Sequence, residues 1–235
     1  MDITMNDSAK KSIISKIVAI FWEPSATFQV LKMRIHWTDL VIPMLIVVCV
    51  SLVSSIHIIP IALDETKARI ENSDALSDTQ KEAALEQIEK RANSPFQYVS
   101  TVVAIGVKWL VLAAVMLMIG NFFLGGELKY KTLLGVTAYI SLIDAVNTGI
   151  KTPLIVSQNT TKIYSSLALF MEESRSFFYR FASNIDLFAI WKIILFSIAL
   201  GTLLNKKANK PFYPIMIIWL LYAVAAALLA GLAKF

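Results

Sequence analysis

Residues 97–124 read QYVSTVVAIGVKWLVLAAVMLMIGNFFL, and this stretch decides the fold. It contains a single charged side chain, that of Lys108, among long runs of apolar ones. An α-helix of about 20 apolar residues is long enough to cross the hydrocarbon core of a bilayer. The stretch therefore predicts a membrane-spanning helix.

Four further stretches of the same kind surround it. Of the 235 residues, 57% are hydrophobic and only 17% are charged, whereas a soluble domain carries about 25% charged residues. We predict an all-α fold, a multi-pass membrane helix bundle with five transmembrane helices. The predicted spans are about 40–63, 97–124, 132–150, 185–204 and 211–233. Residues 1–39 form a cytoplasmic N-terminal region, and residues 40–233 form the membrane domain.

The N-terminal region carries an amphipathic pattern that is too short to span. Apolar side chains recur at helical spacing up to Trp22, and Lys16 is expected on the opposite face. Pro24 ends this helix, and Ser25 begins a second short one. We predict that both helices lie in the membrane interface, or pack on the protein's own cytoplasmic surface, or do both. The expected membrane-interface residues are Lys10, Lys11, Lys16, Trp22 and Trp37.

Two connecting segments carry helices of their own. Residues 77–92 are rich in charged helix formers and predict a surface helix between the first two spans. Residues 151–184 form a longer loop, in which a short helix over 162–181 carries an aromatic patch.

Charge distribution predicts the orientation. Lys and Arg are dense in 1–39, 125–131 and 205–210, whereas residues 64–96 contain more acidic than basic side chains. The positive-inside rule then places the N-terminus in the cytoplasm and the C-terminus outside. The formal charge of +5 does not indicate nucleic-acid binding, because the basic residues flank the apolar runs instead of forming one patch.

Ionisable residues inside the spans are the most informative chemical feature. Lys108, Asp144 and Lys192 each lie about three residues from the middle of a span, toward the outside, which places them at one depth. We predict that Asp144 pairs with one of the two lysines. His57 and Asn147 are expected somewhat further out on the same side, and Asp186 at the outer mouth. Such a cluster either fixes helix register or binds an anion, a lipid headgroup or a proton.

Catalytic and metal-binding signatures are absent from the sequence. There is no HExxH or GxSxG motif and no His/Cys spacing typical of a metal site. We therefore expect no enzymatic activity, no metal and no cofactor. Ala223, Ala227 and Gly231 form a row of small residues on the fifth span, which permits close helix contact within the chain or between two copies.

Several motifs resemble the Yip1 domain family of membrane proteins. The stretch IISKI at 13–17, followed by WEPSATF at 22–28, is similar to the family's N-terminal entry, and GNFFLGG at 120–126 is similar to its central glycine region. Tyr130 and the AYIS run at 138–141 follow. Bacterial members often have a proline after this run, where this chain has Asp144. The resemblance implies five spans, a cytoplasmic N-terminus and no known catalytic chemistry.

Eukaryotic members of that family are linked to Rab GTPases, but this chain has no long cytosolic domain to bind one. A protein of the bacterial cytoplasmic (inner) membrane is therefore expected. The leading hypothesis is a non-enzymatic protein that organises the membrane or scaffolds partners. The alternative is a small transporter or channel for an anion or protons, and a lipid-modifying enzyme ranks last. Expected partners are the lipid bilayer and other proteins or a second copy, with no nucleic acid.

Overall fold

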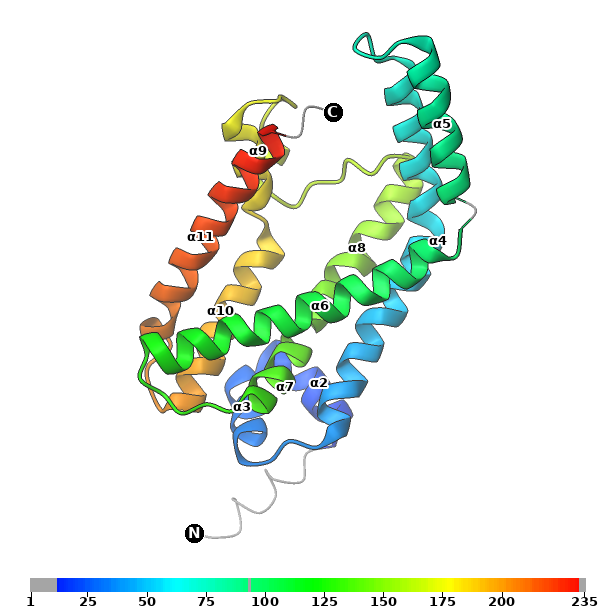
Figure 1. The fold of residues 1–235 in the computed structure, drawn as a ribbon. Helices are drawn as coiled ribbons and strands as arrows, with labels where there is room; N and C mark the ends of the chain where they lie inside the picture. Colours follow the sequence, from blue (N-terminus) through cyan, green and yellow to red (C-terminus); the bar gives the residue numbers. More distant parts are fainter. Residues whose placement is uncertain (1–11, 93, 233–235) are drawn as a thin grey trace, which may run out of the picture. The chain divides into compact units, whose positions relative to one another are not determined.

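The computed structural model describes residues 12–92 and 94–232, which are almost entirely helical (Figure 1). The α-helices are α2 (Ile13–Trp22), α3 (Pro24–Met33), α4 (Trp37–Glu71), α5 (Asp78–Ala92), α6 (Phe96–Met118), α7 (Tyr130–Ile140), α8 (Leu142–Gln158), α9 (Phe177–Asn184), α10 (Leu187–Leu204) and α11 (Asn209–Leu232). A π-helical turn, η1 (Ile119–Phe123), continues α6, and a 3₁₀ turn, η2 (Leu167–Phe170), precedes α9.

Five helical segments are long and apolar enough to cross a membrane, as the sequence predicts. They are Trp37–Glu71, Phe96–Phe123, Tyr130–Gln158, Leu187–Leu204 and Asn209–Leu232. Many of their large apolar side chains are exposed, as on Ile217 and Leu221 of α11. A lipid-facing helix needs no polar surface, because its backbone hydrogen bonds are all internal. The all-α, five-span fold class is therefore confirmed.

The chain divides into two compact units. The first contains the described residues up to Leu45, Lys108–Asp144 and the described residues from Tyr164 onward; the second contains Ile46–Val107 and Ala145–Ile163. In the first unit α3 lies against α7 and α10, so the N-terminal helices pack together with later segments of the chain. The division into a cytoplasmic region 1–39 and a membrane domain 40–233 stays a prediction.

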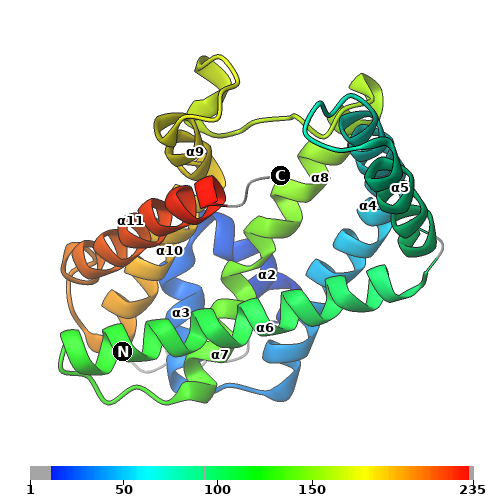
Figure 2. The same cartoon turned by 45° about the horizontal axis from the view of Figure 1, so that its top comes forward.

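In the first unit, α10 lies between α3 and α11, and α9 packs on α11 (Figures 1 and 2). Its interior is built from large side chains that are fully buried, among them Phe28, Leu31, Leu133, Tyr139 and Leu200. In the second unit, α5 lies alongside the end of α4. Lys81 Nζ donates to the carbonyl oxygen of Glu71 at 2.9 Å, which fastens this surface helix.

The connection between α6 and α7 depends on glycine. Gly125 has φ +64°, a conformation that costs glycine least. A Cβ on Gly126 would overlap the side chain of Leu204 and lie 2.8 Å from the carbonyl oxygen of Gly120. Asn121 closes the turn: its Oδ1 accepts from Leu128 N at 2.7 Å, and its Nδ2 donates to Leu128 O at 3.0 Å.

The third span differs from the predicted single helix at 132–150. It is interrupted at Ser141, between α7 and α8, and then continues through Pro153 to Gln158. A proline removes one backbone donor from a helix. Beside it, Thr152 Oγ1 donates to the carbonyl oxygen of Thr148 at 2.7 Å.

The predicted helix over 162–181 is wrong. Residues 165–167 instead run antiparallel to 185–187, with Leu167 N donating to Ile185 O at 3.0 Å and Leu187 N to Ser165 O at 3.1 Å. These backbone groups are therefore paired outside a helix. Only η2 and α9 are helical in this segment.

A buried ion pair joins three elements of the first unit. Lys16 on α2 is bonded to Asp39 in the first turn of α4, and both side chains are buried. Asp39 also accepts from Tyr139 Oη on α7 at 2.9 Å and from His36 N at 3.0 Å. The sequence predicts Lys16 on a polar face toward the surroundings; the structure places it on the inner face of α2, because Asp39 is there to neutralise it.

The replacement Asp39→Asn tests this ion pair. It keeps the shape of the side chain but leaves the Lys16 ammonium buried without a counter-charge. We expect the free energy of unfolding to fall by about 3–5 kcal/mol. The measurement is denaturant or thermal unfolding of the purified protein in detergent.

Glu86→Gln is the matched control. It removes a pair with Lys90, joined at 2.6 Å but with both side chains largely exposed. Exposed pairs contribute at most about 1 kcal/mol, so stability should barely change. Equal losses in the two variants would contradict the role given to Asp39.

Candidate functional site

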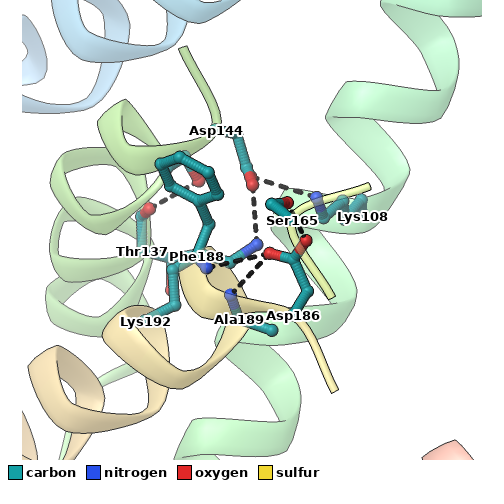
Figure 3. A network of polar contacts seen from close by, with 9 residues as sticks. Lys108, Thr137, Asp144, Ser165, Asp186, Phe188, Ala189 and Lys192 are labelled. Carbon is teal, nitrogen blue, oxygen red and sulfur yellow. Dashed lines mark hydrogen bonds and ion pairs between the residues drawn. The ribbon is translucent and has the colours of Figure 1, made fainter. Parts of the chain in front are cut away.

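Charged residues from three helices meet around Asp144 in the first unit (Figure 3). Lys108 lies on α6, Asp144 in the first turn of α8, and Lys192 on α10. Lys108 Nζ lies 3.0 Å from Asp144 Oδ2, and Lys192 Nζ lies 2.6 Å from Asp144 Oδ1. The predicted ion pair is therefore present, and the carboxylate pairs with both lysines.

The interruption of the third span places Asp144 where a carboxylate is favoured. Asp144 N donates to Ser141 O at 2.9 Å, so the residue sits at the start of α8. Its carboxylate then faces the positive end of the helix dipole. Ser141 Oγ donates to the carbonyl oxygen of Thr137 at 2.7 Å, which ties the break to the end of α7.

Asp186 positions α10, the helix that carries Lys192. It is the N-cap of α10, and its Oδ1 accepts from Phe188 N at 2.8 Å and from Ala189 N at 3.3 Å. Ser165 donates a further hydrogen bond to this carboxylate. Figure 3 draws Asp186 in the same polar network as Lys192. The formal charges of the two lysines and two aspartates in this network cancel.

The two lysines differ in accessibility. The side chain of Lys192 is 19% exposed and that of Asp144 is 22% exposed, whereas the side chain of Lys108 is 53% exposed. The Lys192–Asp144 pair is thus the enclosed one, and Lys108 is the more open partner. The arrangement can hold three helices in register. The Lys108 ammonium can also leave Asp144 and bind an added anion instead.

The other residues singled out in the sequence lie elsewhere. His57 is exposed, and the Oδ1 of Asn147 is buried without a hydrogen-bond partner in the described part of the chain. Both belong to the second unit, so the structure does not assign them to this cluster. Trp22 and Trp37 are exposed, while Lys10 and Lys11 lie outside the described residues.

Within residues 12–92 and 94–232, no three His, Cys, Asp or Glu side chains are grouped as a metal site would require.

Sequence reasoning missed Asp39, because it stands near the edge of a span, where an acidic residue is ordinary. The one available signal was its position in the first turn of a helix, which also fits a residue exposed to water.

The small-residue row on α11 is used within the chain. Ala223 and Ala227 are fully buried, and Arg180 Nε of α9 donates to the carbonyl oxygen of Ala227 at 2.9 Å. A Cβ on Gly231 would lie 2.9 Å from Arg180 Cζ. The row therefore accommodates α9 and its arginine.

Comparison with known proteins supports one family. The model of the Yip1 domain matches residues 18–230, which is nearly the whole chain. Neither the curated proteins nor the solved structures gave a match.

A double-mutant cycle measures the coupling around Asp144. Asp144→Asn removes the carboxylate charge that pairs directly with both lysines, and Lys192→Met leaves that carboxylate with its more exposed partner only. We expect each to destabilise the protein strongly, with the double variant losing less than the sum by about 0.5–3 kcal/mol. Unfolding in detergent is the measurement.

Lys108→Met should cost less than Lys192→Met, because its ammonium is more accessible to solvent. Lys131→Met, at an exposed position of α7, is the control for loss of a lysine. Additive effects of Asp144→Asn and Lys192→Met would show that the pair does not stabilise the fold.

Proposed function

The chain belongs to the Yip1 domain family, and from that premise we propose that it is a non-enzymatic membrane protein that organises the bilayer through its N-terminal helices. The observation that carries the proposal is an apolar stripe on the outer face of α2. Ile14, Val18 and Trp22 recur every four residues and are 71%, 53% and 81% exposed. Such a stripe is typical of a helix that lies in the membrane interface.

The inner face of α2 is fixed to the rest of the first unit. Lys16 and Ile20 are buried, and the ring of Phe21 packs edge-on against Trp191 of α10, with centroids 6.0 Å apart. Ser12 caps the start of the helix by accepting from Ser15 N at 3.2 Å. The apolar stripe is therefore held in a fixed position on the first unit. Its side chains would insert into the lipid at a defined place beside the spans.

Insertion of the stripe is energetically reasonable. Moving one large apolar side chain out of water contributes about 1.5–3 kcal/mol, so three such residues outweigh the loss of side-chain freedom. The basic residues of the N-terminal region favour the cytoplasmic leaflet of a bacterial inner membrane. A wedge on one leaflet changes local lipid packing, and the same fixed surface can hold a protein partner.

The test is membrane remodelling by the reconstituted protein. We expect Ile14→Ser combined with Val18→Ser to abolish the reduction in vesicle diameter caused by the wild type, because the wedge loses its apolar anchor. Proteoliposome diameters measured by electron cryomicroscopy report the effect. Leu169→Ser combined with Phe170→Ser, two exposed apolar residues of η2, is the matched control and should behave as wild type.

A second measurement reports where α2 lies. A polarity-sensitive fluorophore on Val18→Cys, with Cys49→Ser as background, should emit at the shorter wavelengths typical of an apolar environment. Emission from an aqueous environment, or remodelling that survives both serine substitutions, would sink the proposal.

A transport function is the second candidate, and the accessible Lys108 ammonium inside a span favours it. Under this hypothesis, chloride or proton flux into proteoliposomes should fall at least tenfold in Lys108→Met. The comparison needs equal amounts of folded protein in each preparation. Flux that never exceeds that of empty liposomes would exclude transport of these ions and leave membrane organisation as the function.

A further inference from the structure

A polar groove of about 440 Å³ lies between α3 and the C-terminal end of α10, within the first unit. One wall carries Ser25, Gln29 and Lys32 of α3; the other carries Thr202 of α10 with Asn205 and Lys206 beyond it. This groove is separate from the Asp144 cluster and from the outer stripe of α2. Its volume is within the usual range of small-molecule sites, about 300–1,000 Å³.

The groove follows directly from the spacing of its residues. Ser25, Gln29 and Lys32 are four and three positions apart, so they share one face of α3. Asn205, in the left-handed conformation, ends α10 and turns the chain back along the groove. At Gly201 a Cβ would lie 2.9 Å from Lys206 O and 3.2 Å from Ala208 Cα, so only glycine lets the loop approach this closely.

The charges of the groove are all of one sign. Lys32 Nζ donates to Thr202 O at 3.1 Å and to Asn205 Oδ1 at 2.8 Å, which holds the ammonium at the wall. An ammonium has three donors, so one remains for a ligand. Lys206 donates to Leu124 O and retains two. No carboxylate lines the groove, and neither lysine has an ion pair in the part of the chain that the structure describes.

We propose that this groove binds a phosphate group, carried by an anionic phospholipid or by a free organophosphate. Two ammonium groups supply the charge-assisted hydrogen bonds that phosphate oxygens accept most strongly. The hydroxyl of Ser25 and the amides of Gln29 and Asn205 can donate to the remaining oxygens. Ile198, one turn further into the span, also lines the groove, and it suits the apolar part of a glycerophospholipid.

The test uses the full chain in a neutral detergent, with phosphatidylglycerol, phosphatidylcholine, glycerol 3-phosphate and inorganic phosphate as probes. Native mass spectrometry and thermal stabilisation report binding. We expect Lys32→Gln to lower the affinity for the phosphate-bearing ligand by about tenfold to a hundredfold, since it removes one hydrogen bond from a charged donor.

Gln29→Glu is a second variant, which tests the groove even if Lys32→Gln impairs folding. It leaves the contacts of Lys32 in place, adds a negative charge to the wall, and should weaken binding to a similar extent. Lys207→Gln, an exposed lysine of the same loop that does not line the groove, is the matched control and should bind as wild type.

The probes distinguish the two sources of phosphate. Retention of phosphatidylglycerol over phosphatidylcholine, lost in Gln29→Glu, supports a lipid ligand. Binding of glycerol 3-phosphate that is lost in the same variant, without preference for phosphatidylglycerol, supports a free organophosphate. The proposal is overturned if no probe binds, or if Lys207→Gln weakens binding as much as Gln29→Glu does.

Discussion

The first unit depends on the neutralisation of Asp39 where it is buried. An ionised carboxylate in an apolar medium costs several kcal/mol unless it is paired and hydrogen-bonded. Asp39 has three donors, the Lys16 ammonium, the Tyr139 hydroxyl and the His36 amide. Since these come from α2, from α7 and from the chain entering α4, a single carboxylate fixes where all three elements meet. The N-terminal helix is consequently a part of the folded unit rather than an appendage on it.

Asp144 follows the same physics with a different outcome. Its two lysines are unequally enclosed, and Asp186 brings a second negative charge into the network while it caps α10. A balanced set of charges costs less to hold in a membrane than an excess of one sign. This balance favours a structural role for the enclosed Lys192 pair and leaves Lys108 as the partner that is open to exchange.

Much of this arrangement could be predicted from the sequence, for identifiable reasons. A long run of apolar residues has few alternatives to a membrane span, so the five spans could be predicted. Three charges at one depth cost much free energy unless they pair, so the pairing of Asp144 could be predicted as well. The inward position of Lys16 was not. In a soluble helix the apolar face marks the interior, but beside a lipid bilayer both faces can be apolar, so periodicity alone does not say which face meets the protein. The break at Ser141 was also hidden, because a serine that bonds the preceding carbonyl is common within continuous helices.

The two N-terminal helices expose faces of different polarity, and this difference has a physical basis. On α2 the outer face is apolar, while the face of α3 toward α10 carries hydroxyl, amide and ammonium groups. A bilayer interface offers acyl chains and phosphate groups only a few ångströms apart in depth. A pair of short helices joined at Glu23 can meet both layers, with one helix providing apolar contact and the other hydrogen-bond donors. Because Lys16 fixes α2 to the spans and Lys32 fixes α3 to the end of α10, neither contact requires the helices to rearrange, so little ordering cost would oppose lipid binding at either surface.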